Sequence, residues 1–200
     1  GVDMAEDWDA SVRKLHKASV SAIKRLAKEC RDEPVGCFFL DSDEPRYGFV
    51  SISFDTVANN RRTVRELERS AIEGRTKSLR RTDAWKSAKY GIETPRLSPF
   101  NLDSGDFDFG EFGEVEFPAW VKLAEKDKYP RGMEHEDDYL ESSVRLTLWR
   151  VVEQLIEENA FAPLTLGAPF LAGYSFHDSE PVVLRMLNWT DGLSEDGEDD

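Results

Sequence analysis

The amino-acid sequence predicts an α+β fold, a single domain in which a mainly antiparallel sheet packs against two long amphipathic helices. The first observation is helical periodicity, because apolar residues recur at spacings of three and four over about residues 5–31 and again over 136–160. The second is a pair of extended segments, 35–40 and 47–54, joined by a turn-forming stretch. Helices and strands do not alternate regularly along the chain, which disfavours a βαβ architecture.

The segment 5–31 carries one apolar face and is followed by Pro34, which ends a helix. That face consists of Trp8, Val12, Leu15, Ser19, Ile23, Leu26 and Cys30. The residues 35–40 are an apolar run of strand formers, and 47–54 includes an alternating Ser-Ile-Ser-Phe stretch. Two strands joined by a five-residue turn predict an antiparallel hairpin.

The next segment, 56–73, is helical by composition, and its predicted buried side chains are Val64, Leu67, Ala71 and Ile72. From residue 61 to residue 90 the chain holds ten bases and four acids, a local charge of +6. A nucleic-acid surface is one interpretation. The acidic flanking segments favour another, an internal salt-bridged face opposite the acidic loop that follows.

That loop, 101–118, contains six acids and no base, and four phenylalanines are interleaved with them. We expect an ordered loop with short extended pieces. Its phenylalanines are expected to pack against the rest of the domain, namely Phe107, Phe109, Phe112 and Phe117.

The remaining elements complete the fold. A short helix is predicted over 118–126, and the second long helix, over 136–160, buries Leu140, Val144, Leu148, Val151 and Leu155. The segment 171–176 is a predicted strand, and 181–189 is an apolar element that the pattern leaves undecided between helix and strand.

The domain organisation is simple. Residues 1–4 resemble a cloning remnant and a native start at Met4, residues 5–190 form one domain, and the acidic tail 191–200 is expected to be disordered. We expect a cytoplasmic protein with no membrane span, because neither a secretory apolar region nor an 18-residue apolar stretch is present. Reduced Cys30 and Cys37 are the expectation, although a disulfide between them stays open.

The net charge of −14 excludes a sequence-independent nucleic-acid binder, which needs a positive surface, and favours a basic partner. No phosphate loop, dinucleotide fingerprint or C-x-x-C motif is present, so no cofactor is predicted.

Two histidines invite a catalytic or metal interpretation. His135 lies in an acidic run, but the zinc-protease spacing needs a second histidine where Tyr139 stands. His177, Asp178 and Glu180 follow a predicted strand, yet the nucleophile-elbow pattern is incomplete there. The segment 103–108 does not satisfy the calcium-loop spacing. No metal site or catalytic set is therefore predicted.

Several short segments of the sequence carry a resemblance to a known family. Residues 98–107 read SPFNLDSGDF, residues 171–188 read LAGYSFHDSEPVVLRMLN, and the hairpin contains FFL and FVSIS. With the chain length and the N-terminal helix, these resemble the bacterial DUF family numbered 4303, from Trp8 to Trp189. Such families look like neighbours of the immunity proteins that accompany bacterial polymorphic toxins. The resemblance implies a cytosolic antitoxin and carries over no catalytic residue.

We therefore expect a non-enzymatic immunity-type protein that neutralises a cognate toxin with a basic surface by covering its active site. The candidate partner-binding residues are Asp103, Asp106, Phe107, Asp108, Phe109, Glu111, Phe112, Glu114, Glu116, His177, Asp178 and Glu180. The alternatives are a small metal-dependent hydrolase using His177, Asp178 and Glu180 or His135, and an adaptor for another basic partner. The sequence leaves the oligomeric state open.

Overall fold

The computed structural model describes residues 7–81, 100–125, 136–176 and 179–188. It confirms the α+β class: one domain with a five-stranded mixed sheet, most of whose strand pairs are antiparallel. The described elements, in chain order, are α1 (Trp8–Glu29), β1 (Val35–Ser42), η1 (Pro45–Tyr47), β2 (Phe49–Thr56), α2 (Val57–Arg81), η2 (Ser104–Asp106), β3 (Phe109–Glu116), α4 (Pro118–Glu125), α5 (Glu136–Glu157), β4 (Leu166–Phe176) and β5 (Val182–Leu187).

The strands lie in the order β3-β2-β1-β4-β5, so β1 is the central strand. The predicted hairpin is confirmed, with Phe38 opposite Phe54 in the antiparallel β1–β2 pair. On its other side β1 pairs in parallel with β4, a long-range pairing that a sequence pattern does not specify. The undecided last element is a strand, β5, which pairs antiparallel with β4.

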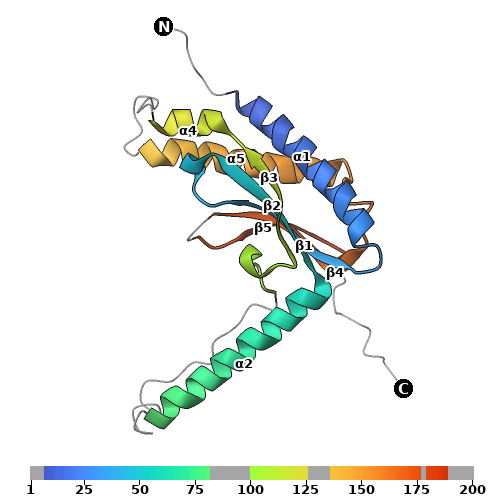
Figure 1. Ribbon diagram of the computed structural model, residues 1–200, viewed down its shortest axis with the longest axis vertical. Helices are drawn as coiled ribbons and strands as arrows, with labels where there is room; N and C mark the ends of the chain where they lie inside the picture. Colours follow the sequence, from blue (N-terminus) through green and yellow to red (C-terminus); the bar gives the residue numbers. More distant parts are fainter. Residues whose placement is uncertain (1–6, 82–99, 126–135, 177–178, 189–200) are drawn as a thin grey trace, which may run out of the picture.

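One face of the sheet is covered by α1, α4 and α5 (Figure 1). The apolar face predicted for the second long helix is confirmed, because all five residues named for it are buried. They pack against alternate strand residues such as Phe38, Ile52 and Phe170, whose side chains point to the same side of the sheet. This layer is the main hydrophobic core.

The opposite face of the sheet carries the other alternate residues. Cys37, Phe39 and Leu171 form a small apolar cluster there, covered by Phe107. Cys37 therefore faces away from Cys30, which belongs to the main core, and both thiols are free. Further along the same face the strands present Asp41, Ser51, Ser53 and Ser175, which makes that part of the sheet surface polar.

The helix α2 extends away from the sheet (Figure 1). It continues to Arg81, beyond the predicted end, and it contacts the body near its start, through Asn59, Asn60 and Arg62. The buried set predicted for it is wrong, because Leu67 is 45% exposed and Ile72 is 64% exposed, while Val64 and Ala71 are half-buried. The periodicity is real, but the sheet does not continue beneath this helix.

The acidic segment is more regular than expected. Its second half is the edge strand β3, which pairs antiparallel with β2, and η2 precedes it. The predicted packing of the phenylalanines against the domain is confirmed, because Phe107 and Phe117 are buried and Phe109 and Phe112 pack against the core. Within the described part of the chain, none of the helices has the length and apolar character needed to span a bilayer.

Candidate functional site

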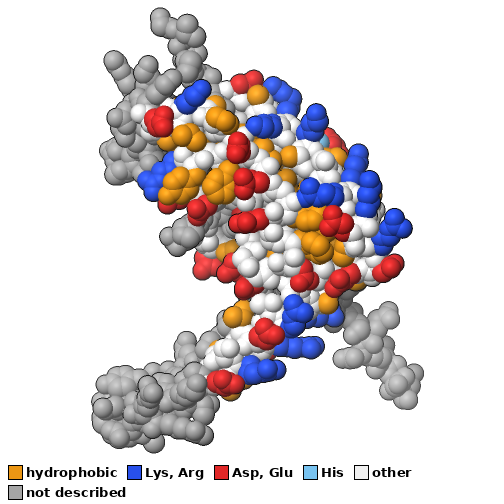
Figure 2. Space-filling view, viewed as in Figure 1, with side chains coloured by type: hydrophobic (Ala, Val, Ile, Leu, Met, Phe, Trp, Pro, Cys, Tyr) orange, Lys and Arg blue, Asp and Glu red, His pale blue; other side chains and the backbone are white. Residues whose placement is uncertain are grey.

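A cavity of about 1270 Å³ opens on the polar part of the uncovered sheet face. We call it the acidic hollow, because its lining includes six carboxylates, Asp41, Asp43, Asp103, Asp108, Glu111 and Glu180, and six serines, Ser42, Ser51, Ser53, Ser104, Ser175 and Ser179. No Lys or Arg is among the described residues that line it. Figure 2 shows acidic side chains gathered on the body between the basic residues of α1 and those of α2.

Asp41 lies at the centre of this arrangement because of the strand register. It stands on the central strand, opposite Ser51 on β2 and Ser175 on β4. The Ser175 hydroxyl donates a hydrogen bond to Oδ1 of Asp41. Oδ2 of Asp41 is buried and has no hydrogen bond of good geometry. Burial raises the pKa of Asp41, and the nearby hydroxyls of Ser175, Ser53 and Ser104 oppose that rise.

This raised pKa has a measurable consequence. The folded chain holds the Asp41 proton more tightly than the unfolded chain does, so the contribution of Asp41 to stability is present at low pH and is lost as the pH rises through its raised pKa. Asn does not titrate. The free energy of unfolding of Asp41→Asn, minus that of the wild type, is therefore expected to increase with pH and then level off.

Urea denaturation at several values between about pH 4 and pH 8 measures this difference. Glu114→Gln, which changes an exposed carboxylate on β3, is the matched control and is expected to show a much flatter difference. A difference for Asp41→Asn that does not vary with pH would contradict the prediction.

A buried polar cluster, the asparagine junction, holds the acidic segment against the start of α2. Its members are Asp55, Asn59, Asn60 and Asn101. Asp55 is fully buried and accepts hydrogen bonds from the side-chain amides of Asn59 and Asn60, each at 2.8 Å. The backbone N–H of Asp108 also donates to Asp55, at 3.1 Å, and Asn60 donates to the carbonyl of Asn101 at 2.6 Å.

The electrostatics of the junction follow from its burial. Loss of solvent raises the pKa of Asp55, the amides of Asn59 and Asn60 oppose the rise, and the neighbouring charge of Asp108 adds to it. Asp108 is itself fixed by the Thr56 hydroxyl, which donates to its carboxylate at 2.6 Å. The junction thereby positions the wall of the hollow to which Asp103, Asp108 and Glu111 belong.

The structure brings together five of the predicted partner-binding residues, because Asp103, Phe107, Asp108, Glu111 and Glu180 all line the hollow. The carboxylates of Asp106, Glu114 and Glu116 are exposed outside it. His177 and Asp178 lie outside the described residues, as does His135.

The phenylalanines of the acidic segment mainly pack against the domain. Phe107 is 7% exposed and contacts Phe39 from above the sheet, so it forms part of the wall rather than a projecting anchor. Phe109 and Phe112 are half-buried and contact each other edge-on, and Phe112 is covered by the guanidinium of Arg25 at 4.0 Å. These rings are used by the fold, because an edge strand can bury aromatic side chains only by packing them back onto its own domain.

Sequence reasoning missed the floor of the hollow. The turn predicted after residue 40 begins at Asp41, yet Asp41 continues the strand β1, and the sequence pattern does not identify Ser51, Ser53 and Ser175 as site residues. The signal was present in the Ser-Ile-Ser alternation of β2, which places two hydroxyls on one face of the sheet.

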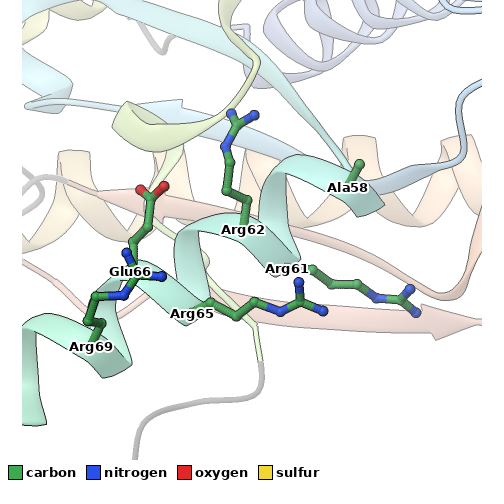
Figure 3. A pocket seen from close by; sticks show the side chains of 6 residues that line it. All are labelled: Ala58, Arg61, Arg62, Arg65, Glu66 and Arg69. Atoms are coloured by element: carbon green, nitrogen blue, oxygen red, sulfur yellow. The ribbon is translucent and has the colours of Figure 1, made fainter.

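The basic residues of α2 line a second, shallower hollow of about 410 Å³, formed by Ala58, Arg61, Arg62, Arg65, Glu66 and Arg69. Figure 3 shows Arg62 pointing toward the acidic segment, whereas Arg61 and Arg65 point away from it. A guanidinium nitrogen of Arg62 lies 3.8 Å from the Asp108 carboxylate. Arg62 therefore makes one contact of the predicted salt-bridged face, whereas Arg61, Arg65 and Arg69 show no ion pair with a described residue.

The described residues contain no group of three His, Cys, Asp or Glu side chains arranged to hold a metal ion. Comparison with protein-family models, with curated proteins and with solved structures finds no match to this chain. The site is therefore interpreted from its own geometry.

Proposed function

We propose that this chain is a non-enzymatic, immunity-type protein that binds a cognate bacterial toxin domain and covers its basic active site. The observation that supports the proposal is the acidic hollow, in which carboxylates from three separate segments surround one cavity without a lining Lys or Arg among the described residues. Such a cavity concentrates negative potential and attracts a basic partner. Charge complementarity then speeds association and selects the partner.

The arrangement of the hollow also favours binding. Its floor consists of three adjacent hydrogen-bonded strands, β2, β1 and β4, and one wall is held by the asparagine junction. A surface that is already ordered loses little conformational entropy when a partner docks. A partner with a protruding basic segment would find the carboxylates in place.

The choice of a toxin as the partner rests on the resemblance of the sequence to immunity-type families. An adaptor for another basic protein would use the same hollow, so identification of the partner distinguishes these two functions. No observation on the described residues supports the metal-dependent hydrolase, because His135 and His177 lie outside them.

The test is co-expression with the toxin domain encoded beside the gene of this protein. We expect a complex that co-purifies and cells that survive toxin expression. The double variant Glu111→Lys with Glu180→Lys reverses two exposed charges of the hollow and is expected to weaken the complex by at least about tenfold.

The matched control is Glu114→Lys with Glu116→Lys, which makes the same change of charge on exposed residues of β3 outside the hollow. We expect it to weaken the complex by less than about threefold. Absence of a complex and of protection would reject the function, and equal weakening by the two double variants would reject the hollow as the interface.

A further inference from the structure

The carboxyl group of Asp41 points to a specific occupant of the hollow. Asp41 lies on the central strand, with serines on both neighbouring strands, and one of its carboxylate oxygens is buried without a hydrogen bond of good geometry. A buried carboxylate without a cation is unfavourable for the fold. Carboxyl groups perturbed by burial cluster at functional sites, where a bound cation is able to supply the missing charge.

The described lysines and arginines do not supply this positive charge to Asp41. The hollow has no lining Lys or Arg among the described residues. Arg145, whose guanidinium lies 4.7 Å from the ring centre of Phe176, pairs with Glu141 on α5 at 2.6 Å. Arg62 lies on α2 beside Asp108, outside the lining of the hollow.

We propose that the hollow seats the guanidinium group of an arginine side chain, contributed by the partner protein, over the buried carboxylate of Asp41. This inference rests on the proposed function for the nature of the partner, and it adds the chemical group that the hollow recognises. The guanidinium occupies the cavity between the walls, and the charge of Asp41 lies beneath it in the floor.

Two features of the lining favour a guanidinium over the ammonium group of lysine. Carboxylates stand on several sides, with Asp103 and Glu111 on the acidic segment and Glu180 before β5, which suits a planar group with five donors. The half-buried ring of Phe49 also lines the hollow. A guanidinium stacks on aromatic faces while it donates hydrogen bonds in its own plane.

The size of the hollow indicates a protein partner. Its volume of about 1270 Å³ exceeds what a single small ligand needs, since such pockets commonly measure about 300–1000 Å³. An arginine side chain fills one part of the cavity, and the backbone that carries it fills another. A segment of a partner protein supplies both.

The experiment uses the full chain and three capped tripeptides, Gly-Arg-Gly, Gly-Lys-Gly and Gly-citrulline-Gly, titrated by NMR on isotope-labelled protein. Citrulline keeps the shape of arginine and removes the charge. We expect saturable binding of the arginine peptide, with shifts of the amide signals of residues 41, 53 and 175, and at least about tenfold weaker binding of the citrulline peptide. The lysine peptide is expected to bind with intermediate affinity.

The key variant is Asp41→Asn, which keeps an Oδ1 acceptor for Ser175 and is expected to weaken binding of the arginine peptide by about tenfold. The matched control, Glu114→Gln, removes one charge outside the hollow and is expected to change binding by less than about twofold. If Asp41→Asn does not fold, Glu111→Gln, an exposed residue of the wall, is expected to weaken binding by about threefold.

Absence of saturable binding, equal binding of the citrulline peptide, tighter binding of the lysine peptide, or unchanged binding by Asp41→Asn would each overturn the inference. The outcome is separable from that of the proposed function. A toxin complex that forms without recognition of the arginine peptide rejects this inference alone. Binding of the arginine peptide without a toxin complex rejects the immunity function and leaves the guanidinium site in place.

Discussion

Replacing Asp55 with alanine is expected to lower the free energy of unfolding by about 2–4 kcal/mol. The carboxylate is fully buried and accepts hydrogen bonds from the side chains of Asn59 and Asn60 and from the backbone N–H of Asp108. Removing it leaves three donors without their acceptor, and each buried unsatisfied donor costs about 1–3 kcal/mol. Relief of the burial penalty on the charge of Asp55 offsets part of this loss.

Urea denaturation measures the loss, and hydrogen exchange locates it. The backbone amides of residues 101–108 are expected to exchange faster in the variant, because the junction that holds this segment is broken. Asp55→Asn keeps one acceptor oxygen and is expected to have an intermediate stability. A loss of stability below about 1 kcal/mol would show that the junction contributes little to holding the wall of the hollow.

Replacing Phe38 with alanine is expected to lower the free energy of unfolding by about 3–5 kcal/mol. Phe38 is fully buried on the central strand, with its ring centre 5.3 Å from that of Phe54 and 5.0 Å from that of Phe161. The substitution removes a large apolar group and leaves a cavity between the sheet and the helices, which a packed interior fills only in part.

Two further variants test whether the loss at Phe38 depends on the lost volume and on the position of the residue in the core. Phe38→Leu keeps most of the volume and is expected to cost about 1–2 kcal/mol. Leu67→Ala, on the part of α2 that leaves the sheet, is expected to change stability by less than about 1 kcal/mol, because that side chain is already 45% exposed. A loss at Leu67 equal to that at Phe38 would contradict the assignment of the core.

The elements that the sequence predicted well are those with a strong local pattern. The spacing of Leu140, Val144 and Leu148 specifies which face of α5 is buried, because a helix repeats every 3.6 residues wherever it lies. The hairpin of β1 and β2 follows from two strands and a short turn, since neighbouring strands joined in this way pair with each other.

The errors arose where the environment decides the outcome. Leu67 and Ile72 have helical spacing, but spacing does not tell whether a sheet lies beneath the helix. Asp41 has the composition of a turn, because carboxylates are rare in strands, and its parallel neighbour β4 lies 125–135 residues away along the chain.

The sequence by itself determined the α+β class, the core faces of α1 and α5, and the presence of an acidic, phenylalanine-rich segment, because composition and periodicity are local properties. The tertiary structure decided that Asp103, Asp108 and Glu111 meet Asp41 and Glu180 around one cavity, and that Phe107 belongs to its wall. The physical reason is that strand order and register bring together residues that are distant in the chain. A change of register by one residue would turn Asp41 to the opposite face of the sheet.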